Sequence, residues 1–181
     1  WWAPPLAMIL RNEEETREFW EAFPYPYRLT YGADFVDDAI QVSINVHNLG
    51  QNEMPIAPGL HPYHPVPAKR KNEIRFCFPG GKLIEDAVRS WGNGGTIEVD
   101  NPISTGDTDH LILKIPKLGD LWIYASQAFR KIWVWSEPDS GFFCLEFVTR
   151  PEGGIVDDPI IIPPNSKLSD VVPGPLEVRY K

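Results

Sequence analysis

His61 and Glu146 are the two residues of this sequence whose types and surroundings best suit proton transfer. His61 lies in the segment Pro58–Pro65, where prolines restrict the backbone on both sides of the imidazole and hold the ring in place. Glu146 is the one carboxylate within Phe142–Phe147, and partial desolvation there raises the pKa of a carboxyl group toward the range of a general base. The two residues can therefore act as proton donor and acceptor.

Each of these residues also has a simpler structural interpretation. A histidine on a loop often only bonds to a backbone carbonyl. A glutamate in an apolar strand can be half of a buried salt bridge, here with Arg150. Taken by themselves, the two residues leave proton transfer and structural roles open.

His64 follows His61 at a spacing that also occurs in metal sites, which makes a small metal-dependent β-barrel enzyme an alternative. A zinc ion typically needs at least three protein ligands, and no third candidate lies near these two in the sequence. We therefore predict that the site holds no metal and uses no cofactor.

Three further groups of side chains suit contacts with a sugar. Asp109 lies in a turn just before a strand, where it either accepts sugar hydroxyls or caps its own backbone. The basic run Lys69–Lys71 can hold a phosphate or form a solvated turn. Trp133 and Trp135 share one face of a strand and can stack on a sugar ring or pack in the core.

The composition narrows the function classes. The 181 residues carry a net charge of −8, which argues against nucleic acid or an anionic membrane as the main partner. The two cysteines, Cys77 and Cys144, form no metal-binding pattern, and we predict both as small core residues in a reducing compartment. With no signal peptide apparent and no apolar run near the ~18 residues that span a bilayer, we expect a cytoplasmic location. The oligomeric state is left open.

Short β-strands dominate the pattern. Gln41 to His47 alternates strictly between polar and apolar residues, as in a strand with one buried face. The 19 prolines and 14 glycines supply the tight turns that separate such strands. Other short runs of this kind are Leu6–Leu10, Tyr25–Tyr31, Ile74–Phe78, Thr96–Val99, Leu111–Ile115, Leu121–Tyr124, Ile132–Trp135, Phe142–Val148, Ile160–Ile162 and Leu176–Tyr180.

Glu13–Trp20 is the one helix candidate, but its flanks favour strands, so we predict a loop or a strand there. Both faces of Phe142–Val148 are apolar apart from Glu146, which is typical of a central, covered strand. The sequence therefore predicts one all-β domain over residues 1–181, an antiparallel β-sandwich.

Several segments occur in an order that resembles one family of sugar enzymes. They are Phe23–Tyr27, Val46–Gly50, Met54–Pro55, Gly59–Tyr63, Cys144–Glu146 and Ile161–Ser166. The ordered set is similar to the aldose 1-epimerase (galactose mutarotase-like) family over nearly the whole chain.

The resemblance implies a large antiparallel β-supersandwich and an isomerase that interconverts the α and β anomers of a hexose or hexose phosphate without a cofactor. By similarity, Glu146 removes the proton of the C1 hydroxyl and His61 protonates the ring oxygen, from opposite sides of the pyranose. We assign substrate contacts to Asp109, Tyr63, His64 and Trp135.

The sequence departs from the family pattern at three points. His64 stands where an aromatic residue is usual, and Phe147 where a proline is common. Members are usually longer, and their N-terminal part supplies another histidine and an arginine to the sugar. Arg11 and Arg17 lie in a different context. The resemblance thus implies an N-terminally shortened member, with a non-catalytic carbohydrate-binding domain of the same fold as the alternative.

Overall fold

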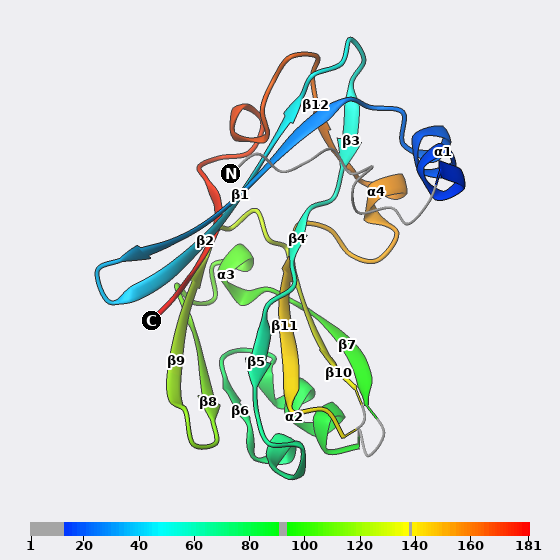
Figure 1. Cartoon of the computed structure of the whole chain (residues 1–181). Helices are drawn as coiled ribbons and strands as arrows, with labels where there is room; N and C mark the ends of the chain where they lie inside the picture. The colour runs from blue at the N-terminus through cyan, green and yellow to red at the C-terminus, as the bar shows by residue number, and fades with distance from the viewer. Residues whose placement is uncertain (1–12, 91–93, 138) are drawn as a thin grey trace.

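The computed structural model describes residues 13–90, 94–137 and 139–181 (Figure 1). The strand expected at Leu6–Leu10 lies outside these residues. Two antiparallel sheets and a separate two-stranded ladder make up the strand content, and an apolar core lies between the two larger sheets. The predicted antiparallel β-sandwich is thereby confirmed.

One sheet has six strands in the order β1-β2-β13-β9-β8-β6, with every neighbouring pair antiparallel. In Figure 1, β1 and β2 form a long hairpin whose tip extends away from the other strands. The strands are β1 (Tyr27–Val36), β2 (Ala39–Asn48), β13 (Leu176–Tyr180), β9 (Gly119–Ala125), β8 (Leu111–Ile115) and β6 (Arg75–Cys77).

The second sheet has the order β4-β11-β10-β7, and β5 pairs with β11 beyond the end of β4. Strand β11 therefore lies in the interior of the sheet, as its apolar composition predicted. Its strands are β4 (Gly59–Leu60), β5 (Tyr63–Pro65), β11 (Phe142–Val148), β10 (Lys131–Ser136) and β7 (Gly95–Asp100), and the small ladder joins β12 (Ile160–Ile162) to β3 (Met54–Ile56).

The alternation along β11 decides which side chains enter the core. Phe143, Leu145 and Phe147 are each at most 2% exposed and join the core cluster. The ring of Phe143 lies 6.2 Å from that of Phe76 on β6, so this face of β11 packs against the six-stranded sheet. Because successive side chains of a strand point to opposite faces, Glu146 belongs to the other face.

The prediction of a loop or strand at Glu13–Trp20 is wrong, because α1 (Glu13–Ala22) is helical. Phe19 and Phe23, four residues apart, bring their rings within 6.0 Å, as residues at this spacing do across a helical turn. The structure also contains α2 (Gly81–Ser90), which the sequence analysis missed. The shorter helices are α3 (Pro102–Thr105), α4 (Gly154–Asp157), η2 (Ala68–Glu73) and η3 (Leu168–Asp170).

The two cysteines lie in different environments. Cys144 is fully buried, as predicted, but Cys77 is exposed and the core assignment for it is wrong. The period of β6 explains this, since Phe76 points into the core and its neighbours must point outward. Both thiols are free. Among the described helices, none is long and apolar enough to cross a membrane.

Asn48, at the end of β2, links that strand to the β12 region by hydrogen bonds. The side chain is fully buried, and its amide nitrogen donates to the carbonyls of Asn52 (2.8 Å), Ile162 (2.9 Å) and Pro163 (3.1 Å). Its amide oxygen accepts from the backbone nitrogen of Gly50 at 2.9 Å. The two amide protons are thus shared among three carbonyls, and one side chain bonds to four backbone groups.

Candidate active site

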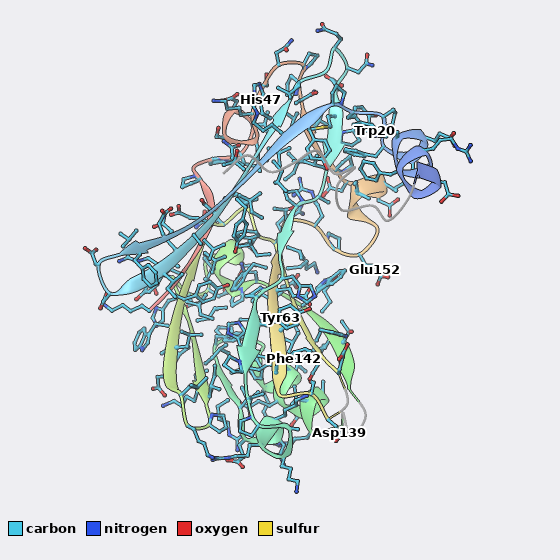
Figure 2. The ribbon with its side chains drawn as sticks, viewed as in Figure 1. Trp20, His47, Tyr63, Asp139, Phe142 and Glu152 are labelled. Atoms are coloured by element: carbon cyan, nitrogen blue, oxygen red, sulfur yellow. The ribbon has the colours of Figure 1, made fainter. Side chains whose placement is uncertain are left out.

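The candidate site lies on the face of the five-stranded sheet that is turned away from the core. Tyr63 on β5, Cys144 on β11 and Trp135 on β10 form one row across the strands, because each is the register partner of the next. In the same way, Glu146 on β11 lies opposite Trp133 on β10. Figure 2 shows Tyr63 beside this sheet, close to the end of β11. The face therefore combines aromatic rings with the carboxylate of Glu146.

A gap in the ladder brings His61 over Glu146. The pairing of β4 with β11 ends at Phe147, and the pairing of β5 with β11 resumes at Cys144. The connection that contains His61 spans this gap, directly beside Glu146. As a result, a loop residue and a strand residue that are 85 positions apart come into contact.

The contact is direct. Nε2 of His61 lies 3.2 Å from Oε1 of Glu146, with the histidine side chain 49% exposed and the glutamate side chain 9% exposed. Tyr63 stacks on the imidazole with ring centroids 5.1 Å apart, and Trp135 meets it edge-on at 5.7 Å. These rings and the flanking prolines restrict the motion of His61.

Gly59 allows the approach of this segment to β11. A Cβ atom at this position would lie 2.7 Å from a methyl carbon of Val148 and 3.2 Å from the carbonyl oxygen of Phe147, so larger residues would push β4 away. The glycine of the Gly-Leu-His-Pro segment therefore serves the close packing that places the imidazole.

Burial raises the pKa of Glu146 above its ordinary value, and the nearby His61 opposes the rise. Within the described part of the chain, His61 is the only ion-pair partner of Glu146. Arg150, which the sequence suggested as a structural partner, instead pairs with Asp158, its Nε lying 3.3 Å from a carboxylate oxygen. The interpretation of Glu146 as half of a salt bridge with Arg150 is therefore wrong.

The expectation that the two groups flank a pyranose from opposite sides is also not met, because they touch. Their contact still suits ring opening. The C1 hydroxyl and the ring oxygen of an aldose are bonded to the same carbon, so a base for one and an acid for the other must approach the same edge of the sugar.

His64 lies on the opposite face of the sheet. It is 8% exposed, and its ring stacks on Phe143 at 5.1 Å and lies 5.9 Å from the ring of Tyr180. Burial lowers the pKa of His64 to about 4, so the ring is neutral at pH 7. This position contradicts both the substrate contact assigned to His64 and a metal site shared with His61. The alternation along β5 explains it, since Tyr63 points outward and His64 inward.

Asp109 lies beside the six-stranded sheet. Its side chain is 88% exposed and bonds to Nδ1 of His110, whose ring stacks on Trp122 of β9 at 4.7 Å. That hydrogen bond holds the pKa of Asp109 below its ordinary value. These contacts contradict the assignment of Asp109 to the site of Glu146, and they fit a polar turn.

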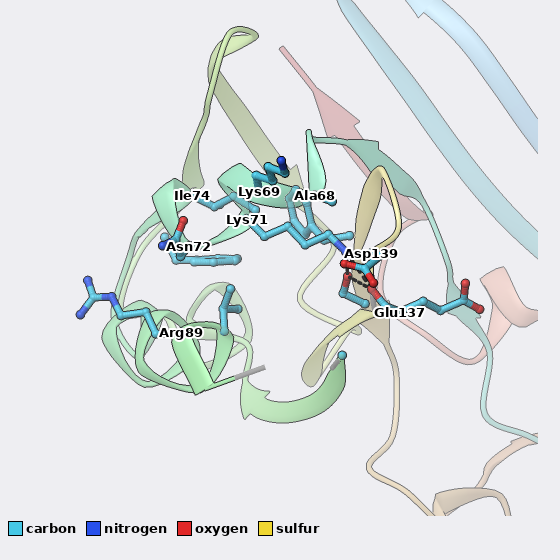
Figure 3. Close-up of a pocket in the computed structure, with 13 residues that line it drawn as sticks. Ala68, Lys69, Lys71, Asn72, Ile74, Arg89, Glu137 and Asp139 are labelled. Atoms are coloured by element: carbon cyan, nitrogen blue, oxygen red, sulfur yellow. Dashed lines mark hydrogen bonds between the residues drawn. The ribbon is translucent and has the colours of Figure 1, made fainter. Parts of the chain in front are cut away.

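The basic run lies at a separate cavity of about 250 Å³, shown in Figure 3. Nζ of Lys71 donates to the hydroxyls of Ser136 (2.6 Å) and Ser140 (2.7 Å) and to the carbonyl of Glu137 (2.9 Å). All three protons of this ammonium group are therefore engaged with the protein. The structural interpretation of the run, a turn fixed to the β10–β11 connection, is favoured over a phosphate site.

The sequence did not predict two features of the site, the position of Phe142 and the bond between Trp133 and Glu98. Phe142 packs between Tyr63 and Trp135, with ring centroids 4.9 Å and 5.8 Å away. Nε1 of Trp133 donates to a carboxylate oxygen of Glu98 at 2.6 Å. The alternation along β11 places Phe142 on the same face as Glu146. This alternation is the signal that could have identified Phe142 as part of the site.

Comparisons with solved structures agree with this architecture. A galactose mutarotase-like protein from Clostridium acetobutylicum superposes with a TM-score of 0.63 at 14% identity, over 94% of this chain and 58% of its own. A galactose mutarotase-like protein from Lactobacillus casei gives 0.62 at 15% identity, over 94% and 67% of the two chains. The chain has the galactose mutarotase-like fold.

The resemblance seen in the sequence is thus confirmed at the level of the fold. A protein from Synechocystis superposes on this chain with a TM-score of 0.70 at 16% identity, over 94% of this chain. This chain spans 58% of the length of the Synechocystis and Clostridium proteins. No protein-family model and no curated protein matches the sequence.

Proposed function

We propose that this chain is an aldose 1-epimerase-like isomerase that interconverts the α and β anomers of a hexose. The observation that carries the proposal is the 3.2 Å contact between the half-exposed imidazole of His61 and the buried carboxylate of Glu146. The galactose mutarotase-like fold supports it, because the similar solved structures from Clostridium and Lactobacillus bear that name.

In the proposed reaction, Glu146 accepts the proton of the C1 hydroxyl while protonated His61 donates a proton to the ring oxygen. The bond from C1 to the ring oxygen breaks, and its electron pair stays on that oxygen. C1 becomes the carbonyl carbon of the open-chain aldose. Rotation about C1–C2 and reversal of both transfers give the other anomer. Protons and electrons balance within the sugar and the two side chains.

The environment of each group suits its role. Burial disfavours the charged form of Glu146, so the carboxylate is a stronger base than an exposed glutamate. The exposed side of His61 leaves the imidazole accessible to a sugar from solvent. Tyr63, 60% exposed, and Trp135 offer aromatic faces beside it.

The proposal is tested by following mutarotation of freshly dissolved α-anomers of several hexoses and hexose 6-phosphates by polarimetry. We expect a first-order approach to equilibrium whose rate increases in proportion to protein concentration above the buffer rate. Rates equal to those of heat-denatured protein for every sugar would reject the proposal.

The pH profile should reflect the buried base. Since Glu146 must be deprotonated to accept a proton, kcat/KM falls as the pH drops through its pKa, which burial holds above the ordinary 4.5. We therefore expect the acid limb of the profile, measured in the presence of EDTA and corrected for the buffer rate, to lie above pH 4.5. A rate that stays constant down to this pH would contradict the assignment of Glu146 as the base.

A non-catalytic carbohydrate-binding domain is the second candidate, and the aromatic row formed by Tyr63, Phe142 and Trp135 favours it. A sugar that packs on these rings buries apolar area, which contributes roughly 25 cal/mol per Å². Under either candidate, we expect Trp135→Ala to weaken sugar affinity by about 2- to 10-fold in calorimetry. Trp122→Ala, which alters the other sheet, is the matched control and should leave affinity unchanged. Binding without any acceleration of anomer exchange would favour this second candidate.

A further inference from the structure

The site brings together a third side chain that neither proposed function uses. Nε2 or Nδ1 of His61, Sγ of Cys144 and a carboxylate oxygen of Glu146 all lie within 4.8 Å of one another. In the part of the chain that the structure describes, this is the one group of three or more such side chains that could surround a metal ion. This group is not the pair of His61 and His64 that the sequence suggested as metal ligands, because those two side chains lie on opposite faces of the sheet.

The origin of the cluster is geometric. Cys144 and Glu146 are two residues apart on β11, so the period of a strand sets both on the same face. His61 reaches them from the gap between β4 and β5. Two ligands thus lie on a central strand, and the third comes from a half-exposed loop side chain.

The donor set is selective. Thiolate, imidazole and carboxylate are the three ligand types that zinc accepts in proteins, whereas magnesium and calcium prefer oxygen alone. Zinc lies about 2.0–2.3 Å from such atoms, and no two of the three ligand atoms are more than 4.8 Å apart, so they have to approach one another by at most roughly 1 Å to share an ion. Small rotations of the side chains within the cluster can provide this movement.

We propose that His61, Cys144 and Glu146 bind a Zn²⁺ ion, and that the ion inhibits the site by occupying both proton-transfer groups. Binding releases the thiol proton of Cys144 to solvent and leaves the fourth coordination position open on the exposed side of His61. The inhibition rests on the proposed function, whereas the metal site does not.

Metal binding is measured on the purified chain after treatment with a chelator. Zn²⁺ is titrated in competition with a chromophoric chelator, and Co²⁺ is used as a spectroscopic probe for thiolate ligation. We expect one equivalent of metal and a thiolate-to-cobalt charge-transfer band in the near ultraviolet. Cys144→Ser should lose this band and weaken Zn²⁺ binding by at least about tenfold. Cys77→Ser, which removes the exposed thiol of β6, is the matched control and should keep both.

The result that would overturn the site is cobalt binding without the charge-transfer band, or equal Zn²⁺ affinity in Cys144→Ser and the unmodified chain. Inhibition is scored separately, as the ratio of anomer-exchange rates with and without Zn²⁺. If the unmodified chain binds Zn²⁺ but exchanges anomers at the same rate with and without it, the inhibitory role is wrong. Metal binding by a chain that never accelerates anomer exchange would reject the proposed enzyme and support the metal site alone.

Discussion

Glu146→Gln is expected to lower kcat for anomer exchange by about 10²- to 10⁴-fold, the usual contribution of a general base. The amide has the shape of the carboxylate but cannot accept the proton of the C1 hydroxyl. Polarimetry at pH 7 measures the loss. Glu152→Gln, at an exposed position just beyond β11, is the control and should keep the full rate. Full activity of Glu146→Gln would remove this residue from the mechanism.

The same substitution should leave the fold at least as stable. Because burial raises the folded-state pKa of Glu146, the folded protein binds this proton more tightly than the unfolded chain does. Its contribution to stability is therefore greatest below the ordinary pKa and is lost as the pH rises through the raised value. At pH 7 the neutral glutamine avoids the cost of burying a charge. Urea unfolding at pH 7 should give an equal or higher midpoint for the variant, which separates lost catalysis from lost folding.

Asn48→Ala is expected to lower the free energy of unfolding by about 2–4 kcal/mol, because the two amide protons and the amide oxygen lose hydrogen bonds of roughly 1 kcal/mol each. Of their backbone partners, Gly50 and Ile162 are buried. In a domain with a total stability of about 5–15 kcal/mol, this is a large share. Urea or thermal unfolding monitored by circular dichroism measures it.

The matched control for this variant is Asn52→Ala. Asn52 is exposed and receives the amide of Asn48 through its backbone carbonyl, which alanine retains. It should change stability by less than about 0.5 kcal/mol. An Asn48→Ala protein as stable as this control would show that the side-chain hydrogen bonds of Asn48 contribute little net stability.

The strands could be predicted from the sequence because they show either a period of two or a short continuous apolar run. The alternation at Gln41–His47 corresponds to β2, and the apolar run Phe142–Val148 corresponds to β11, an interior strand of its sheet. The helices could not, because their apolar contacts depend on distant partners. In α2, Ile84 is fully buried within the core cluster and Glu85 accepts from the backbone nitrogen of Phe76 at 3.1 Å. Glycines next to this short segment are typical of turns, and for that reason the sequence did not predict a helix there.

For the site, the sequence indicated the two proton-transfer residues but not their neighbours. His61 and Glu146 stood out because each is unusual for its surroundings. The depth of His64 depends on which face of β5 meets the core, and the segment is too short to show a period. Asp109 was assigned from its turn alone, and the sheet to which that turn belongs is fixed only by long-range pairing.

The gap between β4 and β5 has a consequence for how this protein can be altered. Leu60 and Tyr63 are anchored to fixed partners on β11, so the number of residues between them sets the reach of the imidazole. Surface connections usually accept insertions and deletions, but here a single added or removed residue would turn His61 out of line with Glu146. Under the proposed function, changes in sugar preference are therefore expected from substitutions on the aromatic row, with the length of this connection preserved.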